Sequence, residues 1–165
     1  MTREEFIALV SASQVSLRRF LLSLCKGNAS IADDIAQEAL VNAYVSFSSF
    51  HGRARFETWL FRIAYHCFID YVRDQRIQTE PLDSLTAQAL HSSDATDRSF
   101  QYKDLYQAIE ALPEKERATL LLFYMEDRPI REIVQILGIP GGSVRAYLTR
   151  GRRHIKAYLE KWKTR

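Results

Sequence analysis

Apolar residues recur every three to four positions over long stretches of this chain, and in its 165 residues only four Pro and six Gly interrupt that spacing. The spacing places apolar side chains along one face of an α-helix, whereas a half-buried strand needs them at alternate positions. No stretch of the chain alternates in that way. The sequence therefore predicts an all-α protein, and its 47% apolar residues are enough to build compact cores.

The first part of the chain is expected to form three helices. The first covers about 3–25, and the second begins at Ser30, because a hydroxyl three residues before an acid is the capping-box arrangement. A Ser-rich break at 48–57 precedes the third helix, over about 58–76. The side of this helix expected to face a core is formed by Trp59, Leu60, Ile63, Ala64, Cys67 and Tyr71.

The second part of the chain follows a polar segment. Residues 77–99 are acidic and show no sustained period, which predicts a linker. Further on, a short helix over about 130–137 and a longer one from Ser143 are separated by a Gly- and Pro-rich turn. The expected fold is two helical domains, 1–76 and 100–165, joined by a flexible linker, with a helix-turn-helix in the second.

Charge is distributed unevenly along the chain, whose net charge is +3. Residues 141–165 hold eight Lys or Arg against one acid, Glu160, so this segment carries +7 and the rest of the chain −4. A folding segment this basic is expected to contact a polyanion, although a solvated helix face explains many basic runs equally well. On charge alone, nucleic acid is the favoured partner.

Other classes of protein lack the features they would need. Cys25 and Cys67 lie in apolar helical patterns without metal-ligand spacing, so buried reduced thiols are expected rather than a zinc site or a disulfide. No nucleophile, phosphate-loop or dinucleotide motif is present, which predicts no catalytic residues, no metal, no cofactor and no enzymatic activity. The first residues lack the apolar core of a signal peptide and no apolar run approaches about 20 residues, so a cytoplasmic protein without membrane insertion is expected.

The segment 131–148 is typical of a helix-turn-helix, in which Gly138 gives the turn its backbone freedom. Five apolar residues can close one small core between its two helices: Ile133, Leu137, Ile139, Val144 and Leu148. The motif predicts DNA binding. An ordinary helical hairpin that happens to be basic is the alternative, and the strong positive charge after the turn favours DNA.

The second helix of this motif would present its first turns to the major groove. The residues then within reach of base edges are Ser143, Arg145, Ala146 and Thr149. Arg150 and Arg153 lie further along the helix, where contact with phosphates is favoured over base readout.

Asp34, Gln37 and Glu38 share one face of the expected second helix, away from its apolar side. They could form an acidic face for a partner. Alternatively, Asp33 and Asp34 simply complement the positive end of the helix, which stabilises it by about 0.5 kcal/mol for each residue. Spacing alone favours the second interpretation.

The break before the third helix, and that helix itself, combine aromatic residues with basic ones. The loop and helix start contain Phe50, Arg53, Arg55, Phe56 and Trp59, and the helix face opposite the core contains Arg62, His66 and Arg73. This composition is used to stack unpaired bases while neutralising phosphates. Core aromatics with solvated arginine neighbours are an equally good interpretation of the loop alone, and a second DNA-binding domain in the chain favours single-strand contact.

Five motifs in order resemble those of extracytoplasmic-function sigma factors of bacterial RNA polymerase. DDIAQEA at 33–39 and FETWLFRIA at 56–64 are similar to region two of that family. ALPEKER at 111–117, EIVQILG at 132–138 and GSVRAYLTRGR at 142–152 are similar to region four. The ordered set covers nearly the whole chain outside the expected linker and is far more specific than any single motif.

The resemblance implies a sigma factor that binds core RNA polymerase and directs promoter recognition, DNA melting and transcription initiation. Asp34, Gln37 and Glu38 would then meet the polymerase clamp, which reverses the interpretation from spacing alone. The residues named above in the loop and third helix would bind the minus-ten element, and those of the basic C-terminal helix the minus-thirty-five element. An anti-sigma factor is a further expected partner. His66, Ser143 and Gly151 depart from the residues frequent in the family.

Two other functions remain open at this point. A stand-alone helix-turn-helix regulator would bind duplex operators by itself, as a dimer. A helical interaction module would bind a partner without DNA. Against the regulator, the first domain shows no ligand-pocket pattern, and its arginine-aromatic loop suits single strands better than duplex DNA.

Overall fold

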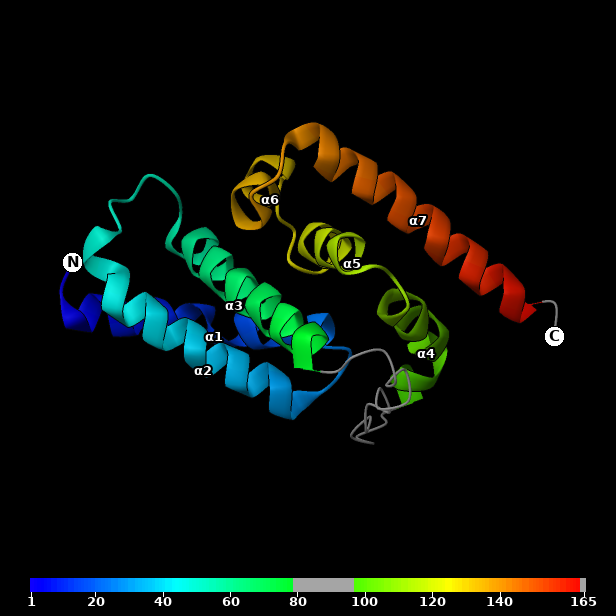
Figure 1. Cartoon of the computed structure of the whole chain (residues 1–165), viewed down its shortest axis with the longest axis horizontal. Helices are drawn as coiled ribbons and strands as arrows, with labels where there is room; N and C mark the ends of the chain where they lie inside the picture. The colour runs from blue at the N-terminus through cyan, green and yellow to red at the C-terminus, as the bar shows by residue number, and fades with distance from the viewer. Residues whose placement is uncertain (79–96, 164–165) are drawn as a thin grey trace.

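The computed structural model describes the backbone of residues 1–78 and 97–163, and the side chains of 1–78 and 102–161. These residues form helices and short connections, with no strand among them, which confirms the all-α prediction. The helices are α1 (Arg3–Leu24), α2 (Ala29–Ser46), α3 (Phe56–Gln78), α4 (Asp97–Glu110), α5 (Glu114–Leu120), α6 (Ile130–Leu137) and α7 (Gly141–Lys163) (Figure 1). The ends of the predicted linker, 77–78 and 97–99, are helical, and the rest of it lies outside the described residues.

The predicted cap of α2, Ser30, was wrong by two residues. Asn28, not Ser30, is the cap: its side chain accepts a hydrogen bond from the backbone N–H of Ile31 at 3.1 Å. The cause is that Lys26 and Gly27 both have positive φ and reverse the chain, so that Asn28 is the last extended residue before the helix. At α1 the capping box is instead formed by Thr2 and Glu5, whose cross-bonds are 2.8 and 3.2 Å long.

The first three helices pack around one core. Phe20, Leu21 and Leu24 of α1 and Leu60 and Phe61 of α3 are fully buried, while α2 contributes small side chains that let it lie close: Ala32, Ala36, Ala39 and Ala43. By length and composition α1 could also span a membrane. Its apolar side packs on α2 and α3, however, as in the core helix of a globular domain.

The C-terminal helices form the predicted helix-turn-helix. Gly138 ends α6 in the left-handed conformation, with φ of 67°, which favours glycine. The core predicted for the motif is confirmed, because its residues are buried or half-buried: Ile133, Leu137, Ile139, Val144 and Leu148. A π-helical turn at Leu121–Met125 (η2) continues α5 and leads into the loop before α6.

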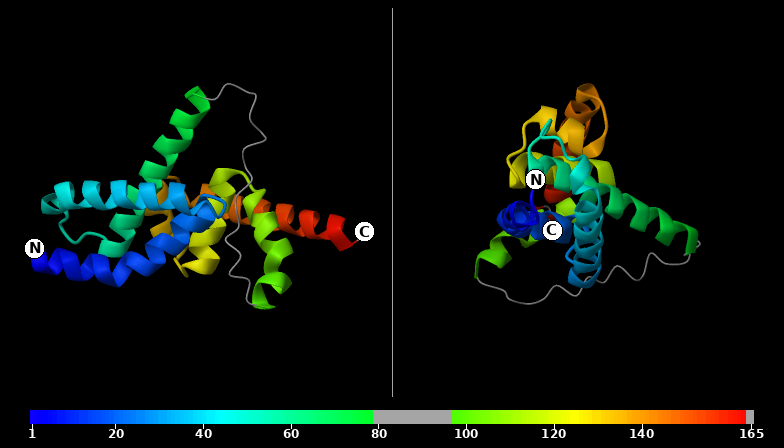
Figure 2. Two further views of the ribbon diagram at one scale, coloured as in Figure 1. Left: turned by 90° about the horizontal axis from the view of Figure 1, so that it is seen from below. Right: turned by 90° about the vertical axis from the view of Figure 1, so that its left-hand side faces the viewer.

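The two halves of the chain pack against each other. The helix α6 lies on α3 (Figures 1 and 2), and η2 and α5 contact α1. The buried apolar residues of both halves therefore form one continuous cluster. Consequently α3 is buried on a second side that the sequence pattern did not predict, where Tyr65 and Phe68 are nearly inaccessible to solvent. The C-terminal end of α7 extends away from the first three helices.

Candidate nucleic-acid and partner-binding surfaces

The acidic face predicted on α2 is exposed. Asp34, Gln37 and Glu38 point into solvent, whereas the opposite side of the helix is in the core. Asp33 is engaged elsewhere, in an ion pair with Arg18 of α1 at 3.0 Å. The three predicted residues therefore form one accessible patch on a rigid helix.

An aromatic cluster supports the loop between α2 and α3. The ring of Phe50 lies 5.1 Å from that of Trp59, and both are only partly buried. Phe56 lies beneath them with 7% of its surface exposed, packed edge-on against Phe50 and against Phe6 of α1. Of the predicted aromatic residues, Phe50 and Trp59 can present a ring face to a ligand, while Phe56 holds them in place from below.

Basic side chains extend from this cluster along α3. Arg53, Arg55, Arg62, His66 and Arg73 are all exposed. A shallow pocket of about 380 Å³ lies along α3 and is lined by Asn42, Trp59, Arg62, Ile63, His66, Cys67 and Asp70. An aromatic ring, a guanidinium, an imidazole and an amide thus converge on one space between α2 and α3.

Two local interactions orient this surface. The Nδ1 atom of His66 lies 2.7 Å from the carbonyl oxygen of Arg62, one turn earlier in α3. Arg73 pairs with Asp70 at 3.3 Å and Asp74 at 3.8 Å, which lowers the positive charge at the far end of the helix. Near the loop, Arg55 in turn pairs with Glu132 of α6 at 3.8 Å, so part of the positive charge there is neutralised as well.

The residues predicted to bind the minus-thirty-five element lie along the first half of α7, away from its buried side. Arg145, Thr149, Arg150 and Arg153 are exposed, and Ser143 and Ala146 are half-buried. The hydroxyl of Thr149 donates to the Arg145 carbonyl oxygen at 3.0 Å. Val144 and Leu148 anchor the other side of the helix in the core, so the exposed residues are held on a fixed face.

Sequence reasoning missed a set of ion pairs that join the two halves. Arg19 of α1 binds Glu126 through two bonds of 2.9 Å, and Arg128 binds Glu57 of α3 at 2.6 Å. Arg19, Glu126 and Arg128 lie in no motif, and the motif that contains Glu57 does not indicate its partner, so each would be taken for a surface charge until the halves are placed together. The carboxylate of Glu126 raises the pKa of Arg19 further above its ordinary value, by hydrogen bonding first and by charge second.

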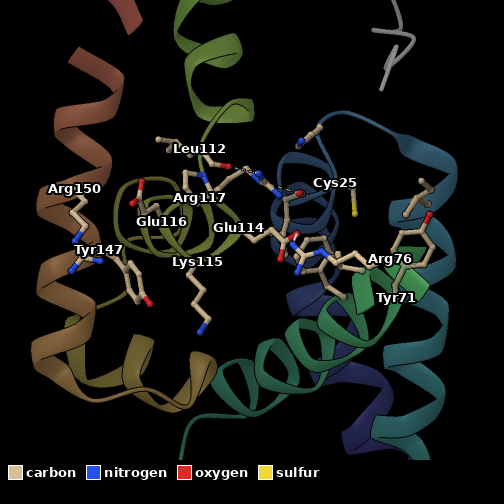
Figure 3. Close-up of a pocket in the computed structure, with 16 residues that line it drawn as sticks. Cys25, Tyr71, Arg76, Leu112, Glu114, Lys115, Glu116, Arg117, Tyr147 and Arg150 are labelled. Atoms are coloured by element: carbon tan, nitrogen blue, oxygen red, sulfur yellow. Dashed lines mark hydrogen bonds and ion pairs between the residues drawn. The ribbon is translucent and has the colours of Figure 1, made fainter. Parts of the chain in front are cut away.

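A larger pocket of about 740 Å³ lies between the two halves (Figure 3). Arg76 at the end of α3 pairs with Glu114 of α5 at 2.8 Å beside it. Arg117 is buried and donates to the carbonyl oxygens of Leu24 and Leu112. Burial raises the pKa of Cys25 to about 12, so this thiol is an unreactive part of the wall. No group of metal-ligating side chains occurs in the part of the chain that the structure describes.

Comparison with known proteins connects these surfaces to a family. Residues 9–77 match the family model of sigma-70 region 2, and residues 102–155 match sigma-70 region 4. The chain is 34% identical over 145 residues to the ECF RNA polymerase sigma factor SigW of Bacillus subtilis, an alignment that covers 81% of this chain and 78% of SigW. The chain belongs to the ECF sigma factors.

Further relatives and folds agree with this assignment. The chain is 29% identical to the ECF sigma factor EcfG of Rhodopseudomonas palustris over 95% of its own length and 84% of that protein. Its fold is similar to that of the sigma factor RpoE from Bartonella quintana, solved with the anti-sigma factor NepR: the TM-score is 0.76 at 21% identity, over 95% of this chain and 98% of the other. As an ECF sigma factor, the protein directs RNA polymerase to promoters and initiates transcription.

Proposed function

We propose that this sigma factor divides its work among three surfaces. The α2 patch of Asp34, Gln37 and Glu38 binds core RNA polymerase. The loop and α3 surface around Phe50, Trp59 and the neighbouring basic residues binds the melted minus-ten strand. The exposed face of α7 reads the minus-thirty-five duplex. The observation that carries the proposal is that all three sets are accessible while the opposite side of each helix is anchored in the core.

The minus-ten surface suits an unpaired strand. Base stacking on an aromatic ring contributes about 1–3 kcal/mol, and Phe50 and Trp59 offer half-exposed rings for it. Arg53, Arg55 and Arg62 would neutralise the adjacent phosphates. Phe56 acts here as the support of the two rings, because its own ring is buried.

The remaining parts of the proposal follow from the same surfaces. The protein has no enzymatic activity of its own and works in the cytoplasm, where the polymerase is. An anti-sigma factor is a suitable regulatory partner, since the structural relatives RpoE and CnrH were solved with NepR and with the cytosolic domain of CnrY. A stand-alone regulator would not need the region 2 half, which matches over 9–77.

The experiment is run-off transcription with purified core polymerase, the full chain and a promoter library. We expect transcripts that depend on both protein and core. Replacing two acids of the α2 patch, as Asp34→Lys with Glu38→Lys, should abolish holoenzyme assembly at unchanged helicity. The matched control is Glu4→Lys with Asp104→Lys, which makes the same change in net charge at exposed positions elsewhere.

The proposal fails if the α2 variant assembles as the wild type does. Tight, sequence-specific binding of duplex DNA by the free chain, with no effect of core polymerase, would favour the stand-alone regulator instead.

A further inference from the structure

The pocket of about 740 Å³ between the two halves is separate from the surfaces proposed for core polymerase and for the minus-ten strand. Its volume lies in the range of about 300–1,000 Å³ that is usual for small-molecule sites. One wall comes from α1, α2 and α3, and the other from α5 and the first half of α7 (Figure 3). The apolar part of the lining consists of Leu24, Ile31, Phe68, Val72, Leu112 and Pro113. The pocket therefore has the size and the apolar surface of a ligand site.

Basic side chains outnumber acidic ones in this lining. The bases are Lys26, Arg76, Lys115, Arg117 and Arg150, and the acids are Glu114 and Glu116. Glu114 is already engaged by Arg76, at 2.8 Å. Glu116 is engaged by His154, whose Nδ1 atom lies 2.6 Å from its carboxylate. Arg150 also belongs to the face of α7 proposed to contact DNA. Without Arg150, four bases still oppose two acids, so the pocket favours an anion.

Arg117 places a buried positive charge in the pocket wall. The residue is 3% exposed, and its guanidinium donates to the carbonyl oxygens of Leu24 and Leu112 at 3.1 and 2.8 Å. Burial, as the largest cause, lowers the pKa of Arg117 from its ordinary value, and the carboxylate of Glu114 opposes this only in part. The surroundings therefore do not fully compensate the charge. An anion bound beside Arg117 would do so, and a planar guanidinium suits a phosphate group.

Tyrosine rings lie on both sides of the charged centre. Tyr71 of α3 and Tyr147 of α7 are half-buried, and Figure 3 shows them on opposite sides of Lys115. The guanidinium of Arg150 lies 5.7 Å from the centre of the Tyr147 ring. A flat ring can stack on a tyrosine or on a guanidinium plane. The pocket therefore offers stacking surface beside its cations.

We propose that this pocket binds a small ligand that carries phosphate groups and a flat ring, as a nucleotide does. Lys26 and Lys115 approach the phosphates from exposed positions, and Arg117 binds them from the wall. The ring stacks on Tyr147, and the apolar side chains exclude water from it. The proposal goes beyond the three surfaces of the proposed function and does not depend on them.

The test is isothermal titration calorimetry of the free chain with four probes, in the absence of magnesium so that no cation masks the phosphates. ATP carries both the ring and the phosphates, adenosine only the ring, and inorganic pyrophosphate only the phosphates. Hexaglutamate is a flexible anion that carries neither. We expect ATP to bind most tightly and pyrophosphate more weakly. Adenosine and hexaglutamate should bind roughly tenfold or more weaker than ATP, because each lacks the charge-assisted hydrogen bonds to phosphate.

Two variants separate the parts of the site. Lys115→Glu should weaken ATP and pyrophosphate binding roughly tenfold or more, because a charge-assisted hydrogen bond becomes a repulsion. Its matched control is Arg3→Glu, which makes the same charge change in the first turn of another helix, where an acid is equally favourable. Tyr147→Leu keeps an apolar side chain and should weaken ATP binding about threefold or more, while pyrophosphate binding stays unchanged.

Circular dichroism checks that each variant is as helical as the wild type, and Lys115→Gln is the second variant if Lys115→Glu does not fold. The inference is overturned if ATP shows no binding at about millimolar concentration, or if Lys115→Glu and Arg3→Glu weaken it equally. Hexaglutamate bound as tightly as ATP would overturn it as well, since the site would then select charge alone, as for an acidic peptide. None of these measurements uses polymerase or DNA, so their outcome is distinguishable from a failure of the proposed function in the run-off assay.

Discussion

Gly151 shows how one missing side chain sets the position of α7. A Cβ atom built on this residue would lie 2.7 Å from Cδ1 and 3.1 Å from Cγ of Leu120, on α5. Real Cβ atoms do not approach other atoms so closely, and Leu120 is itself 5% exposed in the core. The close packing of α7 on α5 therefore depends on glycine at position 151.

We expect Gly151→Ala to lower the free energy of unfolding by about 1 kcal/mol. Overpacking a core costs about 1–3 kcal/mol, and the better helix propensity of Ala returns up to about 1 kcal/mol. Gly142→Ala is the control, because nothing lies within 4 Å of a Cβ there, and it should be neutral or slightly stabilising. Urea unfolding of both variants checks this. Equal stability of the two would show that Leu120 moves aside freely.

Among single residues, the sequence predicted those whose role depends on their neighbours in the chain. It missed those that pair with residues far away in the sequence. Gly138 was predicted from its position in the turn, because the left-handed conformation is a local requirement. Phe56 was grouped with the DNA-binding aromatic residues Phe50 and Trp59, because no local pattern indicates which of the three rings is buried. Arg19 and Glu126 are separated by more than a hundred residues, and their pairing depends on the arrangement of the two halves.

In the proposed function, α7 would make two kinds of contact with DNA along its length, one with bases and one with phosphates. Arg145 lies in its first turns, which would enter the major groove, and Arg153 lies about 12 Å further along at about 1.5 Å per residue. A bidentate arginine contact with guanine contributes about 1–3 kcal/mol of discrimination, whereas a phosphate contact contributes to all sequences alike. The two arginines should therefore behave differently when they are removed.

Arg145→Ala in the holoenzyme should weaken binding to a cognate promoter more than to one with a scrambled minus-thirty-five element. Arg153→Ala should weaken both equally and lower the slope of log affinity against log salt by about one. Binding measured on both promoters over a salt series separates these outcomes. If Arg145→Ala affects both promoters alike, Ser143 and Thr149 become the residues to test for sequence reading.

The helices themselves were largely predictable, because their apolar period is local. The exceptions are the cap of α2 and the second buried side of α3. The predicted stripe from Trp59 to Tyr71 faces α1 and α2, whereas Tyr65 lies near Arg117 and Tyr147 of the other half. A helix that packs on two sides has no clear polar face, and its buried residues cannot then be predicted from apolar periodicity. The expectation of two separate domains hid this second contact.

The whole molecule should lose stability at alkaline pH. Burial, as the largest cause, raises the pKa of Cys25 from 9.0 to about 12 and that of Tyr65 from 10.0 to about 12. Both groups are neutral below their pKa, and their folded-state pKa lies above the unfolded value. Their contribution is therefore complete below about pH 9 and is lost as the pH rises toward 12.

We expect the free energy of unfolding to fall by roughly 3 kcal/mol between about pH 8 and about pH 10.5 from these two groups. Cys25→Ala and Tyr65→Phe should each flatten the dependence, and the double variant should flatten it most. Urea unfolding at several pH values measures the slopes. Parallel slopes for the wild type and the double variant would assign the alkaline loss to other groups.

The aromatic side of α3 also bears on the lifetime of the protein. Phe61, Tyr65 and Phe68 are buried while the halves are in contact, and Tyr65 lies among residues of the second half. A chain that opens without a partner would present these rings to solvent, and proteases cleave such transiently opened states in proportion to their population. Contact between the halves would then slow turnover of the idle factor.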